Sequence, residues 1–179
     1  MTRRYTYDCP VRWSDLDSFG HVNNSRFLTL YEEARVALMF TEARRAGIGT
    51  LADGIVVARH EVDYLRPVDH LATVRIEMWI AELRSSRITV GYELFAGPDL
   101  ASRARTICVP FDLAVGRPRR VSDAEREYLN AWVSSRCATG RVVRRPWPTW
   151  PAWSGSTRRR WCGCARPRPL SARRSAERS

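Results

Sequence analysis

The 179-residue sequence contains no lysine and no long apolar segment, and these absences limit the kinds of protein it can be. No apolar run approaches the roughly 20 residues that a membrane-spanning helix needs, so we expect no membrane insertion. Behind Arg3 and Arg4 there is no apolar stretch of the kind that forms the core of a secretory signal. We therefore expect the protein to be cytoplasmic.

Cysteine and histidine are scarce. The five cysteines are an odd number at irregular spacing, which favours reduced thiols over a framework of disulfides. Cys162 and Cys164 lie far from all three histidines, and no second cysteine pair follows them. Because zinc sites need four such ligands at suitable spacing, we expect no metal site.

The positive charge is unevenly distributed, and every basic residue is arginine. Residues 1–136 hold 19 arginines against 18 acidic residues, whereas residues 137–179 hold 11 arginines against one acidic residue, Glu177. A strongly basic chain is often a nucleic-acid or membrane-surface binder. Here the main body is nearly neutral, so the net charge of +11 does not indicate such a function for it.

The segment 136–179 differs in composition from the rest of the chain. It has prolines every few residues, clusters of arginine and tryptophans without periodicity, a pattern from which no core can be built. It can be a disordered tail, a tether for nucleic acid or an anionic membrane, or out-of-frame coding from a GC-rich gene. We favour the last interpretation, place one domain at 1–135, and consider a nucleic-acid partner unfavoured.

The beginning of the body predicts a strand followed by a long helix. Over Tyr5–Trp13 the apolar residues alternate, so that Trp13 and Cys9 share one face of a strand. From about residue 24 to 46 apolar residues recur at helical spacing without an intervening proline. Gly47 stands where a C-terminal glycine ends a helix.

Four further strands and a short helix complete the body. The strands are expected at 55–65, 71–83, 87–96 and 101–113. Short turns between consecutive strands indicate antiparallel pairing, because a parallel return needs a long crossover. Ser122 and Glu125 have capping-box spacing at the start of a helix over 122–132. The order predicts an α+β fold in which a five-stranded antiparallel sheet curls around the long helix.

Asp15 and Asp17 form a D-x-D pair between the first strand and the long helix. Such a pair is common by chance, and it can hold a divalent metal in a sugar-nucleotide enzyme. No βαβ unit is present here to carry a nucleotide, which counts against that interpretation. An aspartate before a helix also commonly serves as a turn or cap residue. That role stays open for both residues, and more so for Asp15.

Two segments carry a family resemblance. Residues 15–35 read D-L-D-S-F-G-H-V-N-N-S-R-F-L-T-L-Y-E-E-A-R, and residues 62–68 read V-D-Y-L-R-P-V. They resemble hotdog-fold acyl-CoA thioesterases of the 4-hydroxybenzoyl-CoA thioesterase type, and the similarity in element order extends over about 5–135. The resemblance implies the hotdog fold and hydrolysis of an acyl-CoA or acyl-carrier-protein thioester, with no metal and no redox cofactor. It also implies a homodimer or homotetramer, with the substrate channel between subunits.

The resemblance assigns the catalytic candidates. Asp17 matches the family's catalytic carboxylate, and a thioester can be attacked either by a carboxylate or by water that a carboxylate has deprotonated. The sequence does not choose between base and nucleophile. His21 is a candidate for orienting water or contacting substrate, and Asn23 for holding the water or the thioester. Local hydrogen bonding by His21 and helix capping by Asn23 are the competing roles.

The substrate-binding candidates are Gly20, Asn24, Arg59, His60 and Arg66. The last three are cationic or potentially cationic, so they are candidates for the coenzyme A phosphates. Charged residues at strand ends are also often merely solvated. Glu32 and Arg35 are three residues apart, which favours a salt bridge along the helix.

Alternatives to a thioesterase remain. A non-catalytic acyl-CoA-binding module would share the motif, although a binding site alone has no need of the Asp17 carboxylate. A hotdog dehydratase matches the H-V-N-N segment less well. The acyl group stays open, because Phe27, Leu30, Tyr31 and Met39 can line an acyl tunnel, although core packing explains them more simply.

Overall fold

The computed structural model describes residues 3–70 and 73–134. Its strands form one antiparallel sheet in the order β1-β3-β4-β5-β2, so that β1 and β2 are the two edges. The strands are β1 (Tyr5–Pro10), β2 (Ile55–Tyr64), β3 (Thr73–Leu83), β4 (Ile88–Ala96) and β5 (Asp99–Asp112). A short strand β6 (Arg117–Pro118) pairs with β5 and was not predicted.

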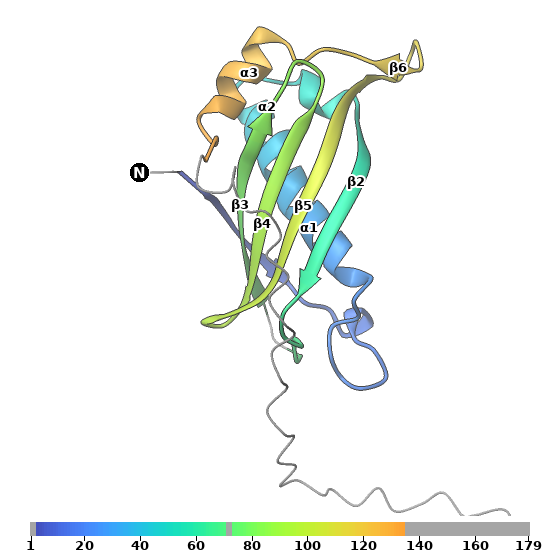
Figure 1. The fold of residues 1–179 in the computed structure, drawn as a ribbon, viewed down its shortest axis with the longest axis vertical. Helices are drawn as coiled ribbons and strands as arrows, with labels where there is room; N and C mark the ends of the chain where they lie inside the picture. Colours follow the sequence, from blue (N-terminus) through green and yellow to red (C-terminus); the bar gives the residue numbers. More distant parts are fainter. Residues whose placement is uncertain (1–2, 71–72, 135–179) are drawn as a thin grey trace, which may run out of the picture. The chain divides into compact units, whose positions relative to one another are not determined.

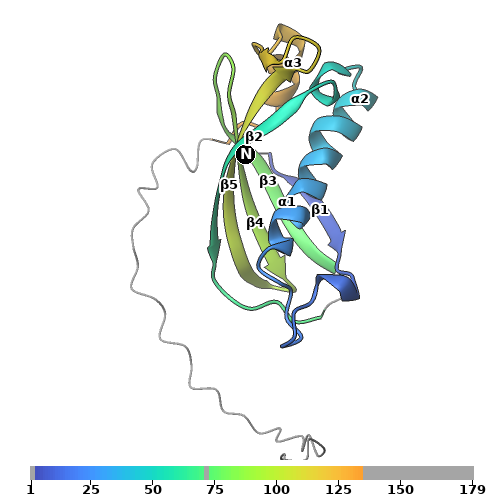
Figure 2. The same ribbon diagram turned by 90° about the vertical axis from the view of Figure 1, so that its right-hand side faces the viewer.

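One long helical segment lies against the sheet. It begins as α1 (Arg26–Val36), continues as the π-helix η2 (Ala37–Glu42) and finishes as α2 (Ala43–Arg45). Gly47 follows it with a φ of 82°, a conformation that favours glycine. The sheet curls around this helix (Figures 1 and 2). This is the hotdog arrangement that the sequence predicted.

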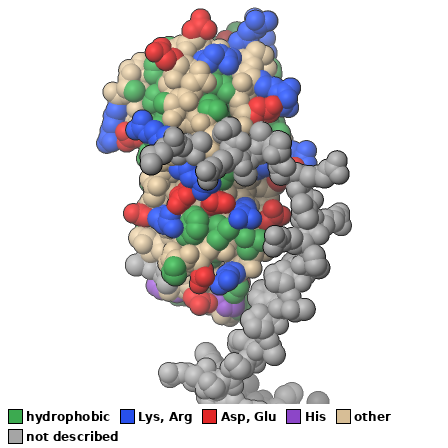
Figure 3. All heavy atoms as spheres, turned by 60° about the vertical axis from the view of Figure 1, so that its left-hand side comes forward, with side chains coloured by type: hydrophobic (Ala, Val, Ile, Leu, Met, Phe, Trp, Pro, Cys, Tyr) green, Lys and Arg blue, Asp and Glu red, His purple; other side chains and the backbone are tan. Residues whose placement is uncertain are grey.

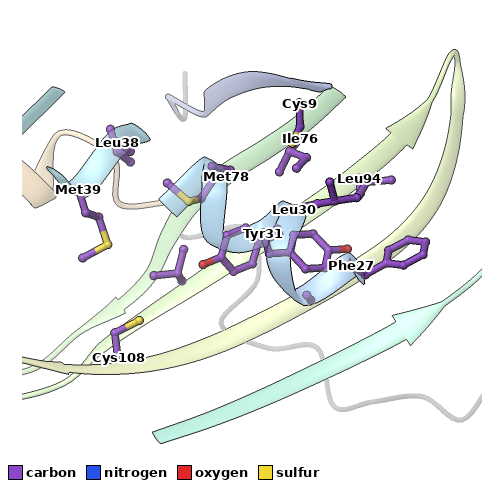
Figure 4. Packing of buried hydrophobic residues seen from close by; sticks show 14 of the residues in the cluster. Cys9, Phe27, Leu30, Tyr31, Leu38, Met39, Ile76, Met78, Leu94 and Cys108 are labelled. Atoms are coloured by element: carbon purple, nitrogen blue, oxygen red, sulfur yellow. The ribbon is translucent and has the colours of Figure 1, made fainter. Parts of the chain in front are cut away.

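The core fills the space between the sheet and the helix (Figure 4). In β3 the alternate residues Val74, Ile76, Met78 and Ile80 are buried, as the period-two pleat of a strand requires. Burying one such side chain contributes about 1.5–3 kcal/mol. The core is therefore the main source of stability.

The four apolar helix residues considered for an acyl tunnel belong to this core. Each is at most 3% exposed: Phe27, Leu30, Tyr31 and Met39. The rings of Tyr31 and Tyr92 lie 4.9 Å apart between centroids, which joins the helix to β4. The structure thus supports core packing for these residues.

The short helix α3 (Asp123–Asn130) starts with the predicted capping box. The Glu125 N–H donates to Ser122 Oγ at 3.2 Å, and the Glu125 carboxylate accepts from the Ser122 N–H at 2.8 Å. Tyr128 donates its hydroxyl hydrogen to the carbonyl of Leu38 at 2.8 Å. The capping bonds fix the start of α3, and the Tyr128 bond ties α3 to the η2 part of the long helix.

The first strand is shorter than predicted. It ends at Pro10, because the Arg12 N–H donates to Asp15 Oδ2 at 2.8 Å and the chain turns into the 3-10 helix η1 (Trp13–Asp15). Trp13 is 83% exposed, so the prediction that it shares the buried face of the strand was wrong. The local hydrogen bond of Asp15 outweighs the alternating pattern.

The predicted domain of 1–135 is described almost throughout, whereas the segment 136–179 lies outside the described residues. The interpretations of that segment, including the Cys162 and Cys164 pair, therefore stay predictions. Within the described chain no helix is both long and apolar enough to cross a membrane. On the face in Figure 3, acidic and arginine side chains are interspersed among apolar ones, as the near-neutral charge of 1–136 leads one to expect.

Candidate active site

The loop between η1 and α1 is built around the Asp17 side chain. Asp17 Oδ1 accepts hydrogen bonds from the backbone N–H groups of Phe19 at 2.8 Å and His21 at 3.2 Å. The Asp17 N–H donates to the carbonyl of His21 at 2.7 Å, and the Gly20 N–H donates to the carbonyl of Asp17 at 3.1 Å. Asp17 is therefore a turn residue as well as a catalytic candidate, and its carboxylate is held at one oxygen and remains half-buried.

Gly20 closes the same turn. Its φ is 83°, in the left-handed region that residues other than glycine and asparagine rarely adopt. The structure thus gives Gly20 a conformational role. Its predicted contact with substrate stays a prediction.

Asp15 differs from Asp17 although it is only two residues away. Its side chain is buried, and its Oδ1 lies 3.7 Å from Arg26 Nε, while Oδ2 accepts from the Arg12 N–H. Its carbonyl accepts from the Asn23 N–H at 2.8 Å. Asp15 therefore fixes the ends of the loop, and this matches the structural role that the sequence favoured for it.

His21 lies beside Asp69, which directly follows the V-D-Y-L-R-P-V segment and which the resemblance did not single out. Its Nε2 is 3.4 Å from Asp69 Oδ1, and the two residues form an isolated antiparallel bridge. The neighbouring Val22 N–H donates to the carbonyl of Val68 at 2.8 Å. An imidazole next to a carboxylate can be held in one orientation and can carry a proton. Asp69 is thus a candidate that sequence reasoning missed, because no helical or strand pattern links it to His21.

The two asparagines lie just before the start of α1. Asn23 Oδ1 accepts from both the N–H and the hydroxyl of Ser25, each at 2.9 Å, so α1 begins at Arg26 rather than at the predicted Asn24. The carbonyl of Asn24 accepts from the Tyr64 hydroxyl at 2.9 Å. Asn23 thus forms a turn ahead of the helix, whereas Ser25 is the N-cap residue and its side chain makes no capping bond, so the predicted capping role of Asn23 is not what the structure shows. A further role for either asparagine toward substrate stays a prediction.

Tyr64 ties the end of β2 to the site. Besides its bond to Asn24, its ring contacts Phe27 edge-on with the ring centroids 5.2 Å apart. Burial raises the pKa of its hydroxyl, which therefore stays protonated and able to donate at neutral pH. In the sequence, Tyr64 stood out only as a member of the V-D-Y-L-R-P-V segment that carries the resemblance.

Arg59 and His60, two of the residues predicted to contact coenzyme A phosphates, lie within β2. The third, Arg66, lies two residues beyond the end of that strand. Arg59 pairs with Glu61 at 2.5 Å, and Arg66 pairs with Asp99 at 3.0 Å. His60 Nδ1 lies 2.9 Å from Thr106 Oγ1, and burial followed by the charge of Arg35 lowers the pKa of its imidazole. At about 3.3 Å per residue, His60 is about 13 Å along the strand from Tyr64. The structure brings together Asp17, Gly20, His21, Asn23 and Asn24, but it does not place Arg59 and His60 beside them.

The predicted ion pair of the helix is present. Arg35 Nη2 lies 3.3 Å from Glu32 Oε1, and Nη1 donates to the Tyr92 hydroxyl at 3.4 Å. Burial raises the pKa of Tyr92 to about 12. A neutral hydroxyl can therefore accept from the buried guanidinium of Arg35 without becoming a second charge.

Neither of two hollows on the described chain is lined by Asp17, His21 or Asn23. They measure about 610 Å³ and about 240 Å³ and lie along the outer side of the long helix. In the part of the chain that the structure describes, no three His, Cys, Asp or Glu side chains cluster in a way that could hold a metal ion. The groups of the site that could take part in a reaction are thus the half-exposed carboxylate of Asp17, the imidazole of His21 beside Asp69, and the first backbone N–H groups of α1.

Comparison with known proteins supports a family assignment. The model of the thioesterase-like superfamily matches residues 11–133, a range that includes the whole Asp17 loop. No protein with a curated description matches the chain.

Solved structures show similar folds. A Thermus thermophilus thioesterase complexed with coenzyme A and zinc is 31% identical, with a TM-score of 0.59 and coverage of 71% of this chain and 92% of that one. A Pseudomonas aeruginosa protein to which a thioesterase function is ascribed is 33% identical, with a TM-score of 0.61 and coverage of 70% and 98%. A predicted thioesterase from Bacillus stearothermophilus, 24% identical with a TM-score of 0.64 and coverage of 74% and 98%, shows similarity of fold alone.

Proposed function

Because the chain belongs to the thioesterase-like superfamily, we propose that it hydrolyses an acyl-CoA or acyl-carrier-protein thioester to a free acid and a thiol. Coenzyme A in the structure of the 31% identical Thermus thermophilus thioesterase supports a coenzyme A thioester as substrate. The resemblance of residues 15–35 and 62–68 to the 4-hydroxybenzoyl-CoA thioesterase type supports the same substrate class.

Asp17 is the group that starts the reaction. Its Oδ1 accepts hydrogen bonds from two backbone N–H groups, and these two bonds leave Oδ2 unused by the turn. As a general base, Asp17 takes a proton from water while the water oxygen attacks the thioester carbon. As a nucleophile, it attacks the carbon itself and forms a mixed anhydride, which water then hydrolyses. In both routes the C–S bond breaks and the sulfur leaves as a thiolate, which takes its proton from the protonated Asp17 in the first route and from solvent in the second.

The start of α1 supplies donors for the oxyanion. The first N–H groups of a helix lack partners within the helix and carry a partial positive charge. Since α1 begins at Arg26, directly after the Asp17 loop, the amides of its first turn lie at the same end of the molecule as the carboxylate, although the Arg26 N–H itself already donates to the carbonyl of Asn23 at 2.9 Å. Hydrogen bonds from such amides stabilise negative charge that develops on the thioester oxygen.

His21 and Asp69 supply a second polar group at this end. Their side chains are 3.4 Å apart, and His21 is about half-exposed. An imidazole held by a carboxylate can orient a water molecule or donate a proton to the leaving thiolate. Arg66, two residues beyond the end of β2, is the cationic candidate for a coenzyme A phosphate that does not lie within the strand, and it would have to exchange Asp99 for the ligand.

A second copy of the chain is also part of the proposal. Strand β2 is an edge of the sheet, ten residues long, and its Val56 and Val57 are 37% and 40% exposed. A long edge with exposed apolar residues tends to pair with another strand. Pairing of two β2 strands in antiparallel would make a homodimer with two-fold symmetry and a continuous sheet.

The observation that carries the proposal is the half-exposed Asp17 carboxylate, fixed by backbone amides at the entrance to α1 within the family-matched range. The test measures free-thiol release from short, long and aromatic acyl-CoAs by the wild type and by Asp17→Asn. Asparagine keeps an oxygen that can accept the two turn hydrogen bonds, so the loop is expected to persist. We expect turnover to fall by about 10²–10⁴-fold, the usual contribution of a positioned acid or base.

The matched control is Asp53→Asn, an exposed aspartate near the other end of the long helix. It makes the same chemical change and should leave turnover unchanged. If wild type and Asp17→Asn release thiol at the same background rate while both bind coenzyme A, the protein is a non-catalytic acyl-CoA-binding module. That outcome would overturn the enzyme proposal.

A further inference from the structure

The turn between β5 and β6 has a conformation fixed by its own hydrogen bonds. Asp112 Oδ1 accepts from the N–H groups of Ala114 and Val115, both at 3.0 Å. The Gly116 N–H donates to the carbonyl of Asp112 at 2.8 Å. The shape of this hairpin tip therefore does not depend on packing of its side chains against the core.

The side chains at the tip are apolar and point into solvent. Leu113 is 68% exposed and Val115 is 59% exposed, and only Trp13 and Phe19 are more exposed among the large apolar residues of the described chain. Figure 1 shows the β5–β6 hairpin at the end of the sheet opposite the Asp17 loop. The apolar tip is thus a feature separate from the candidate active site.

The residues directly behind the tip are basic. Residues 113–121 read L-A-V-G-R-P-R-R-V, with three arginines and no acidic residue. Arg119 is used within the fold, because it pairs with Glu125 at 2.7 Å. Arg117 and Arg120 are exposed, and among the described residues no carboxylate lies within ion-pair distance of either. Two guanidinium groups are therefore free to meet an external anion.

The apolar side chains and the free cations follow one another along the hairpin. At about 3.3 Å per residue, Arg117 lies about 7 Å behind Val115. A phospholipid surface has the same order, since its phosphates lie several ångströms outside the boundary of the acyl chains. Apolar residues of peripheral proteins are buried about 5–10 Å deep at that boundary. With Leu113 and Val115 at this depth, Arg117 is at the level of the phosphates.

We propose that the β5–β6 hairpin binds the surface of an anionic phospholipid membrane, with Leu113 and Val115 at the acyl boundary and Arg117 and Arg120 attracted by the phosphates. The contact is peripheral and differs from a membrane span. Arg120 lies further back, but anionic lipids attract cations over a Debye length of about 10 Å. A nucleic acid also attracts arginines, yet its phosphate backbone offers no apolar phase to the two side chains at the tip.

The other strongly exposed apolar pair lacks this combination. Trp13 and Phe19 lie on the Asp17 side of the molecule, and the arginine next to Trp13 is already neutralised, since Arg12 lies 3.1 Å from Glu33. Exposed apolar residues alone do not identify what they bind. The free arginines beside Leu113 and Val115 are what favour an anionic lipid surface there.

Vesicle binding by the full-length protein tests the proposal. The probes are vesicles of phosphatidylcholine with an equal part of phosphatidylglycerol, and the partition coefficient is measured by co-sedimentation. We expect Leu113→Ser/Val115→Ser to lower this coefficient at least about tenfold, because the apolar tip is lost. Arg117→Gln/Arg120→Gln should lower it about tenfold on these vesicles and change it little on phosphatidylcholine alone.

A matched variant controls for the general effect of charge. Arg103→Gln/Arg105→Gln removes two exposed arginines from β5 itself, about 30 Å along the strand from the tip, and should keep the wild-type partition coefficient. All substituted residues are exposed, so the thermal unfolding midpoint should be the same in every variant. A variant that binds more weakly at an unchanged midpoint has lost a contact with the membrane.

A local measurement separates the hairpin from the arginine-rich segment 136–179, whose charge also attracts anionic vesicles. Amide hydrogen exchange of residues 113–116 in the full-length wild type reports on the hairpin alone. We expect exchange there to slow on the anionic vesicles and to stay unchanged with a DNA duplex.

Two results would overturn the proposal. One is unchanged exchange at residues 113–116 on the anionic vesicles, and the other is a wild-type partition coefficient for Leu113→Ser/Val115→Ser. Slower exchange with DNA but not with vesicles would also overturn it and would assign the hairpin to nucleic acid. None of these results bears on thioester hydrolysis, which is measured separately as thiol release.

Discussion

Two carboxylates, one in the loop before α1 and one in α3, are held in different ways; Figure 1 shows these two segments near opposite ends of the long helix. Glu125, beside the far end of the helix, is fully buried and accepts from Thr50 Oγ1 at 2.7 Å, from both terminal nitrogens of Arg119, and from the Ser122 N–H. Asp17, before the start of the helix, is half-buried and accepts two backbone N–H groups at one oxygen.

The difference separates a structural carboxylate from one that is available for chemistry. Burial opposes the ionisation of Glu125, but the hydrogen bonds from Arg119, Thr50 and the Ser122 N–H outweigh it and lower its pKa. A carboxylate with all its acceptor positions filled has none left for a water or a substrate. Asp17 has such positions left, because the turn uses only Oδ1.

The largest expected effect on stability comes from Glu125→Gln. This change leaves Arg119 without its counter-ion and disrupts the acceptor pattern of the cap, so we expect the free energy of unfolding to fall by about 3 kcal/mol. Urea denaturation measures it. Asp17→Asn serves as the comparison and should change the free energy of unfolding by about 0.5 kcal/mol or less, since its turn hydrogen bonds remain possible. Equal losses in the two variants would contradict the distinction between the two carboxylates.

Low pH should remove the part of the folding stability that depends on ionised Glu125. The pKa of Glu125 is lowered from its ordinary value of 4.5, and that of Glu77, where burial is outweighed by bonds from Arg4 and Arg75, is lowered too. Because the folded state holds these groups ionised, their contribution is complete above pH 4.5 and is lost as the pH falls through the lower folded pKa. The free energy of unfolding should thus decline below about pH 4.5, and Glu125→Gln should decline less steeply. If the free energy of unfolding depends on pH in the same way for the wild type and for Glu125→Gln, then ionisation of Glu125 does not contribute to the pH dependence of stability.

Gly20→Ala should have an intermediate effect, confined to the Asp17 end. A φ of 83° is unfavourable for alanine by about 1–2 kcal/mol, so the turn that fixes Asp17 Oδ1 should distort. We expect thiol release to fall by about ten- to a hundredfold, with a smaller loss of stability than in Glu125→Gln. Gly20→Asn is the matched control, because asparagine tolerates this conformation, and it should retain more activity than the alanine variant. The reverse ranking would argue against conformation as the reason for glycine here.

Tyr64→Phe should have the smallest effect on thiol release. It removes one hydrogen bond, from the Tyr64 hydroxyl to the carbonyl of Asn24, and keeps the ring contact with Phe27. An exposed bond of this kind contributes about 0.5–1 kcal/mol. We expect thermal unfolding to shift by only a few degrees and thiol release to fall by less than about tenfold. A loss as large as that of Asp17→Asn would place the Tyr64 hydroxyl in the reaction itself.

Much of the fold could be predicted because its signals are local. Alternation in the strands, the apolar spacing of the helix, and the Ser122 and Glu125 capping box each act over a few residues, and the structure confirms them. The end of β1 and the exposure of Trp13 could not be predicted in this way. They follow from a side-chain bond of Asp15 that competes with the strand ladder.

The catalytic candidates were predicted within one stretch of sequence, and that stretch does form one loop. Its partners from elsewhere in the chain were not predicted, because Asp69 and Tyr64 reach it only when the end of β2 and the segment after it fold against the start of α1. Likewise, Arg59 and His60 share a strand with Tyr64, but the extended geometry of that strand carries them away from the loop.

The sequence by itself determined the elements, the antiparallel order and the loop that presents Asp17, because hydrophobic period, turn residues and capping residues act through nearest neighbours in the chain. Tertiary structure alone decided which carboxylate is saturated and which is available. Glu125 meets Thr50 and Arg119, and His21 meets Asp69, only after segments distant in sequence pack together. The physical reason is that burial and hydrogen-bond saturation are properties of the packed chain and have no local period in the sequence.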